Sequence, residues 1–125
     1  MATRGVDRER TTPLLVRTFL KKAGHRRQED YAVRGKEPVE DEVQLYTWMD
    51  ATLRELSDLL KEVSPSARER NSQLSFAIVY PDKRGTLVLK EVGIIHSLRK
   101  GEHDDKNLAG LHFQTGDFLD VAVLS

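Results

Sequence analysis

The sequence predicts an α+β domain in which one main helix packs on one face of a mixed β-sheet. Three observations lead to this prediction. Segments with strand-like alternation stand on both sides of one helical stretch, and residues 74–80 form a short, strongly apolar run. Within residues 43–63 the hydrophobic period changes from about 2 to about 3.6 residues. A chain of 125 residues has the size of a single domain.

The stretch 43–63 begins as a strand. One face of an extended chain here would carry Val43, Leu45 and Thr47, and the opposite face Gln44, Tyr46 and Trp48. From residue 53 the apolar positions follow helical spacing, at Leu53, Leu56, Leu59, Leu60 and Val63. We therefore expect a strand followed directly by the one main helix.

The ends of the predicted helix carry their own signals. Thr52 with Glu55 three residues later fits a capping box, and Asp50 is the alternative N-cap. Pro65 stops the helix because proline has no N–H and restricts the residue before it.

Four further strands are expected around this centre. Pro13 introduces residues 14–19, a turn at 81–85 connects residues 74–80 to 86–92, and Gly93 ends that hairpin. The last strand, 118–124, places Leu119, Val121 and Val123 on one face. Residues 1–12 carry little that can be buried and are expected to form a flexible arm, which leaves residues 13–125 as the domain.

A long charged loop is expected near residues 20–42. Residues 21–36 contain six positive and two negative side chains, a net charge of +4, and residues 37–42 contain four negative ones. One interpretation is a solvated loop whose halves compensate each other. The other is a contact surface for a protein or RNA partner, with Lys21, Lys22, Arg26 and Arg27 as its basic residues. On this second interpretation, reversing all four to glutamate should leave the melting temperature nearly unchanged.

Composition and spacing give no sign of an enzyme. The chain has no cysteine, so disulfides, thiol nucleophiles and cysteine-ligated zinc are excluded. The four histidines have no metal-binding spacing, and we expect no cofactor and no metal site. The competing hypothesis is a small enzyme that draws its active residues from His112, Asp117 and Asp120.

Aromatic residues mark a candidate binding surface. If the helix covers one face of the sheet, alternation places Tyr46, Trp48 and Phe118 on the opposite, open face. Aromatic side chains are frequent anchors of protein interfaces. The alternative is that loops or sheet twist bury them.

Several ordered pieces of the chain resemble one protein family. The run Tyr46-Thr47-Trp48-Met49-Asp50-Ala51-Thr52-Leu53-Arg54-Glu55-Leu56 resembles the signature of the Sin-three-associated polypeptide of eighteen kilodaltons, and the resemblance extends from about Val6 to Val123. Thr12 departs from the cysteine expected there, and the proline-rich basic tail of animal members is not found. The other matching pieces are Asp7 to Arg10, Pro13 to Leu15, Ser75 to Tyr80, Lys90 to Gly93 and Gly116 to Val121.

The resemblance implies a ubiquitin-like β-grasp fold and a non-enzymatic adaptor in nuclear complexes. The implied partners are the Sin-three histone deacetylase corepressor, a peptide segment of Acinus or Pinin, and the RNA-recognition domain of a serine-rich splicing activator. The resemblance thus implies an adaptor that links histone deacetylase assemblies, which repress transcription, to assemblies of mRNA splicing and the exon junction. The expected location is the nucleus, with the cytoplasm also open, and RNA contact is expected to be indirect. The alternative is an autonomous RNA-binding module that uses residues 21–36.

No membrane partner is expected. The longest apolar runs fall short of the roughly 18 residues that a spanning helix needs. The first ten residues are too polar for a secretory signal.

Overall fold

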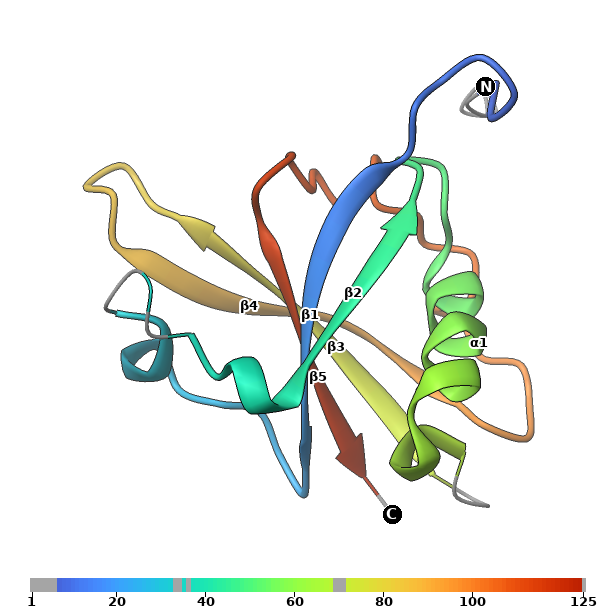
Figure 1. The fold of residues 1–125 in the computed structure, drawn as a ribbon. Coiled ribbons are helices and arrows are strands. Elements are labelled where there is room, and N and C mark those ends of the chain that lie inside the picture. Colours follow the sequence, from blue (N-terminus) through green and yellow to red (C-terminus); the bar gives the residue numbers. More distant parts are fainter. Residues whose placement is uncertain (1–6, 33–34, 36, 69–71, 125) are drawn as a thin grey trace.

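Five strands form one mixed sheet, and a single α-helix packs against it (Figure 1). The structure is a computed structural model and describes residues 7–32, 35, 37–68 and 72–124. Three short 3₁₀ helices lie in the connections, η1 (Gln28–Tyr31), η2 (Val39–Asp41) and η3 (Pro65–Arg68). The main elements are β1 (Leu14–Lys22), β2 (Glu42–Thr47), α1 (Leu53–Val63), β3 (Gln73–Pro81), β4 (Leu87–His96) and β5 (Phe118–Leu124).

The order of the strands across the sheet is β2-β1-β5-β3-β4. The first and last strands, β1 and β5, lie side by side in the middle and run parallel, whereas the other three neighbouring pairs are antiparallel. A hairpin, a crossing helix, a second hairpin and a central returning strand make up the ubiquitin-like β-grasp. The predicted α+β class with a mixed sheet and one main helix is confirmed.

The helix begins and ends where the sequence predicts. Thr52 is the N-cap, and its side chain accepts a hydrogen bond from the backbone N–H of Glu55. Asp50 is therefore not the cap. The helix ends at Val63, whose neighbour Ser64 already has an extended backbone before Pro65. Val63 itself is exposed, so the last residue of the predicted apolar stripe does not reach the core.

The main core lies between α1 and the sheet. Alternation along β2 and β5 delivers their apolar residues to this side, as predicted for Leu45, Leu119 and Val121. Each buried leucine or valine contributes about 1.5–3 kcal/mol to folding relative to an exposed position. The largest fully buried members are Phe76, Phe113, Leu53, Leu56, Leu60, Leu74, Ile95, Leu108, Leu119 and Val16.

Two strands run well past their predicted ends, and β3 is longer by one residue at each end. β1 continues to Lys22 because it keeps pairing with β5, where Lys22 lies opposite Val123. β4 passes through Gly93 to His96, with a bulge in its register against β3. A Cβ at Gly93 would lie 2.8 Å from Cδ1 of Leu53, so the glycine permits close approach of the helix rather than ending the strand.

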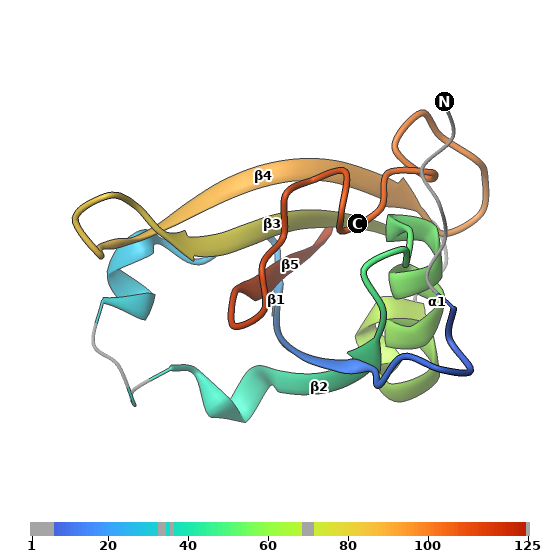
Figure 2. The ribbon, with the colours of Figure 1, turned by 90° about the horizontal axis from the view of Figure 1, so that it is seen from above.

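The second face of the sheet is covered along its middle by residues 23–32 and 37–41, which contain η1 and η2. Figure 2 shows α1 on one side of the strands and this segment on the other. Its Tyr31 is fully buried against Phe19 and Val79, and the partly buried Phe118, Leu87 and Leu89 complete this second, smaller core. We call residues 23–32 and 37–41 the cover. Of the predicted loop 20–42, residues 33, 34 and 36 lie outside the described residues.

Candidate interaction surface on the open face

The face of the sheet opposite α1 has an uncovered strip along β1 and β2. Tyr46 is 64% exposed and Leu15, its partner across the two strands, is 38% exposed. Two large apolar side chains therefore lie next to each other in solvent on an edge of the sheet. A rigid aromatic beside an aliphatic neighbour is suited to anchor a partner protein. Tyr46 is where the sequence places it.

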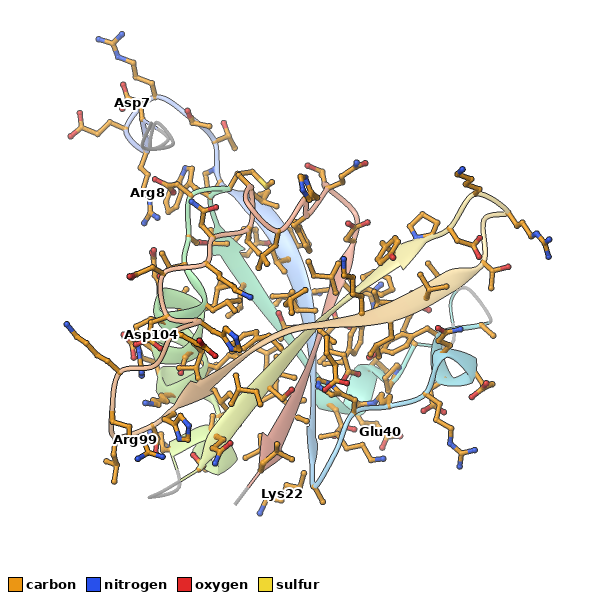
Figure 3. The ribbon with its side chains drawn as sticks, turned by 180° about the vertical axis from the view of Figure 1, so that it is seen from behind. Asp7, Arg8, Lys22, Glu40, Arg99 and Asp104 are labelled. Atoms are coloured by element: carbon orange, nitrogen blue, oxygen red, sulfur yellow. The ribbon has the colours of Figure 1, made fainter. Side chains whose placement is uncertain are left out.

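Trp48, two residues further, is half-buried by the N-terminal segment. The guanidinium carbon of Arg8 lies 4.9 Å from the Trp48 ring centre, and the indole N–H donates to the carbonyl of Thr11 at 2.9 Å. Arg8 also forms ion pairs with Asp50 at 2.8 Å and Glu55 at 2.7 Å, and Figure 3 shows it reaching toward the start of α1. Trp48 is thus engaged within the chain.

These contacts bear on the predicted arm, residues 1–12. Arg8 and Thr11 dock onto the domain, and the hydrogen bonds from Arg8 to the two carboxylates raise the pKa of its guanidinium. Residues 1–6 lie outside the described part of the chain. The flexibility of the arm and its boundary at residue 12 stay predictions.

Phe118 lies on the open face as predicted, but beneath the cover. Its ring centre is 5.4 Å from that of Phe19 and 6.1 Å from that of Tyr31. The guanidinium of Arg17 lies 5.1 Å from the Phe118 ring and forms ion pairs with Glu37 and Glu42. The alternative that loops fold over the aromatics therefore applies to Phe118.

A buried carboxylate fastens the cover to the sheet. Asp120 of β5 is fully buried and accepts hydrogen bonds from the Tyr31 hydroxyl, from Nδ1 of His25 at 2.7 Å and from Arg26 at 3.4 Å. Arg26 also donates to Asp41 at 2.6 Å and to the carbonyl of Leu20 at 2.8 Å. Three side chains of the cover thus converge on one acidic group in the middle of an apolar strand.

The pKa values in this network follow from burial and charge. Burial alone would raise the pKa of Asp120, but the hydrogen bonds from His25 and Tyr31 and the charge of Arg26 hold it below its ordinary value. Burial and the hydrogen bond to Asp120 raise the pKa of Tyr31. Asp120 is therefore ionised and Tyr31 neutral at pH 7, the states in which this hydrogen bond is strongest.

The hydrogen bonds continue to Ser75, whose hydroxyl lies 2.8 Å from Nε2 of His25. Ser75, His25 and Asp120 therefore have the connectivity of a Ser-His-Asp triad. Ser75 is only 4% exposed, and the carboxylate of Asp120 is shared with Tyr31 and Arg26. A nucleophile must reach its substrate, so we assign this network to holding the cover.

The residues of the competing enzyme hypothesis do not share one network. Asp120 belongs to the buried network of the cover, whereas Asp117 accepts a hydrogen bond from the backbone N–H of Gln114 at 3.0 Å. His112 takes a left-handed backbone conformation, with φ at 63°, in the loop before β5. Within the described parts of the chain, no three His, Asp or Glu side chains gather as a metal site. In the same parts, no helix is long and apolar enough to span a membrane.

The four basic residues predicted as a contact surface do not stay together. Lys21, Lys22 and Arg27 are exposed, and Figure 3 shows Lys22 at the end of β1. Arg26 is only 7% exposed because Asp120 and Asp41 bind its guanidinium. The expectation that a reversal including Arg26 spares the melting temperature is therefore corrected, because glutamate at position 26 would be a third carboxylate beside Asp120 and Asp41.

The acidic half of the segment pairs mainly within the domain. Glu37 and Glu42 bind Arg17, and Asp41 binds Arg26. Among the described residues, the ion pair between Asp41 and Arg26 joins the two predicted halves, whereas Glu37 and Glu42 pair with Arg17 of β1. These ion pairs fasten the cover instead of leaving it solvated.

The chain is similar in sequence to known proteins along nearly its whole length. The family model described as Sin3 associated polypeptide p18 (SAP18) matches residues 5–123. A relative from Arabidopsis thaliana, named histone deacetylase complex subunit SAP18, is 58% identical over 120 residues, which are 94% of this chain and 78% of the relative. The Homo sapiens protein of the same name is 47% identical over 119 residues, 94% of this chain and 77% of that protein.

One solved structure aligns along nearly the whole chain. It is the C-terminal ubiquitin-like domain of mouse tubulin-specific chaperone e, with 16% identity, a TM-score of 0.42, and coverage of 97% of this chain and 93% of that one. The fold assignment rests on the strand order and register described above.

Proposed function

Since this chain belongs to the SAP18 family, we propose that it is a non-enzymatic subunit of a histone deacetylase complex and acts there as an adaptor. The observation that carries the proposal is the match to relatives with that name over 94% of the chain. The resemblance drawn from the sequence is confirmed by the same match. In this role the chain contributes to transcription repression by holding other proteins together.

The open face supports the adaptor role. β2 is an edge strand, and Tyr46 with Leu15 forms an exposed apolar pair beside it. An extended peptide can add to such an edge through main-chain hydrogen bonds, with selectivity supplied by the side chains next to it. We propose that Tyr46 is an anchor of this contact.

The splicing-linked contacts are a finer part of the proposal. We propose that the chain binds a peptide segment of Acinus or Pinin and the RNA-recognition domain of a serine-rich splicing activator, in the nucleus. RNA would then be contacted through that second partner. A domain of this size can offer two surfaces of about 800 Å² each, the usual share per partner in a stable complex.

The test is affinity purification of the tagged full chain from nuclear extract, with the copurifying proteins identified and deacetylase activity measured. The wild-type chain should bring down a histone deacetylase, and Tyr46→Ala should reduce its yield by tenfold or more. Val39→Ala, which changes an apolar residue of similar exposure in η2, is the matched control and should behave as wild type. Purification without deacetylase would contradict the proposed function.

Autonomous RNA binding is the alternative that a titration decides. The exposed Lys21, Lys22 and Arg27 are the described residues that favour it. Binding of single-stranded RNA to the isolated chain should then be tight and fall steeply with added salt. The same chain is titrated with the Acinus or Pinin peptide and with the RNA-recognition domain. Tight RNA binding without affinity for either of these protein fragments would replace the adaptor proposal.

A further inference from the structure

A pocket of about 680 Å³ opens at one end of the open face, next to the cover. It exists because β3 runs on to Pro81 whereas its pairing with β5 stops at Val79 and Phe118. The loop before β5 and the end of the cover close its sides. Pockets of about 300–1,000 Å³ with a mainly apolar lining are the usual size for specific binding.

The floor of the pocket is apolar and continues the second core. Phe118, Val79 and Leu87 contribute to both, and Tyr31 lies beside them. Leu111 lines the pocket from the loop before β5. A bulky apolar side chain placed here would extend a cluster of rings and aliphatic groups that the fold has already ordered, so little has to rearrange on binding.

The charged groups in the lining are acidic. Glu37 and Asp117 are carboxylates, and no lysine or arginine is found among the described lining residues. Glu37 is already paired with Arg17 at 2.9 Å. Asp117 accepts a hydrogen bond only from the backbone of Gln114, and no basic side chain of the described residues pairs with it. Burial raises the pKa of Asp117, and no cation among the described residues offsets this cost of desolvating its charge.

We infer that this pocket binds an extended segment of a partner protein, with a bulky apolar side chain on Phe118 and Leu87 and an arginine or lysine against Asp117. Charge complementarity selects this occupant, since an acidic segment would meet two carboxylates. The inference rests on the proposed adaptor function, to which it adds a site and the chemistry of its ligand.

The experiment uses the full chain and a phage library that displays random seven-residue peptides. Selection on the wild type should enrich peptides with a large apolar residue and an arginine or lysine within two positions of it. Selection on Asp117→Lys should instead enrich aspartate or glutamate at that position. Thr115→Trp, which fills the pocket from its exposed rim, should remove the enrichment.

The enriched peptide is then synthesised and titrated by nuclear magnetic resonance. Amide shifts should gather at residues 87, 111–118 and 79–81, and Asp117→Asn should weaken binding about tenfold while keeping an acceptor for the Gln114 N–H. Spectra of each variant without peptide verify the fold. No enrichment, an unchanged charge preference with Asp117→Lys, or shifts outside the pocket would overturn the inference. Concentration-dependent shifts at the pocket without peptide would show a second copy as its occupant, and would overturn it too.

The two proposals fail separately. Deacetylase copurification with the wild type, together with failure of the peptide selection, removes the pocket assignment and keeps the adaptor function. Selective peptide binding without deacetylase copurification removes the adaptor function and keeps the pocket as a site for basic-apolar segments.

Discussion

The two faces of the sheet are buried by different means. Against α1 lies a continuous apolar cluster whose members come from all five strands, the helix and the loops beyond them. On the open face, Phe19, Tyr31 and Val79 form a small buried cluster. The cover is fastened there by hydrogen bonds to one charged residue, Asp120. Burial of the helix face is stabilised by apolar area removed from water, to which each residue adds a share. Burial of the open face is stabilised by a small hydrogen-bond network that must be satisfied as a whole.

Both faces contribute to stability, and the recognition that we propose uses the open one. The helix face is closed and carries the core, whereas the open face offers an uncovered apolar strip, a pocket and a cover held by specific bonds. A partner that binds there meets preformed features and leaves the main core undisturbed. The comparison predicts distinct consequences for substitutions on each side.

The largest effect is expected from removing the carboxylate of the cover. Asp120→Ala leaves Arg26 and Tyr31 without their shared acceptor in a buried site, and removing one partner of a buried ion pair costs about 3–5 kcal/mol. Chemical denaturation of the full chain measures this loss. The control is Asp117→Ala, which breaks a single hydrogen bond and should cost about 0.5–1.5 kcal/mol. Equal losses in both variants would show that Asp120 has no special role.

A comparable loss of unfolding free energy is expected on the helix face, where only apolar contacts are removed. Leu56 is fully buried, so Leu56→Ala should cost about 2–5 kcal/mol in unfolding free energy. Val63→Ala, at an exposed position of the same helix, should change it by no more than about 0.5 kcal/mol. A wild-type denaturation curve for Leu56→Ala would mean that α1 does not pack as described.

Acid should weaken the open face selectively. The folded state lowers the pKa of Asp120, Glu37 and Glu42, through hydrogen bonds and arginine charges that outweigh burial in Asp120. A lowered acid pKa stabilises the fold above the unfolded value of about 4, and this stability is lost as the pH falls through the folded value. Urea unfolding measured from pH 7 to pH 2 should show this decrease in unfolding free energy. The unfolding free energy of Asp120→Asn should depend less steeply on pH. An identical slope in the variant would contradict the network.

The smallest effect on stability is expected from the exposed basic residues. Reversing Lys21, Lys22 and Arg27 to glutamate should leave the melting temperature nearly unchanged and slow association with an acidic partner at low salt. Adding Arg26→Glu should lower the melting temperature sharply, because the new carboxylate would face Asp120 and Asp41. Thermal denaturation of the triple and quadruple variants side by side distinguishes the surface charges from the buried one.

The sequence predicted the helix face well and the open face poorly, for a physical reason. Helical spacing, the Thr52 cap and strand alternation are local patterns, and each appears in the structure where expected. The cover depends on contacts between residues far apart, such as His25 with Asp120, and no local spacing reveals them. One signal was present, since Asp120 is a charged residue in the middle of an apolar strand.

The candidate site divides in the same way. Tyr46 was placed correctly because its exposure follows from the alternation of β2 alone. Arg26 was misplaced because its burial depends on Asp41 and Asp120, which only the folded chain brings to it. Trp48 was expected on an open face, but Arg8, from a segment expected to be flexible, lies against it.

The most direct test is amide hydrogen exchange of the full chain, alone and within the deacetylase complex with which we propose that it copurifies. New protection is expected in the complex at β1, at β2 around Tyr46 and in the loop 111–117 beside the pocket. The solvent side of α1 should exchange at the same rate in both states. New protection confined to α1, with an unchanged open face, would contradict the claim that this protein recognises its partners through the face opposite the helix.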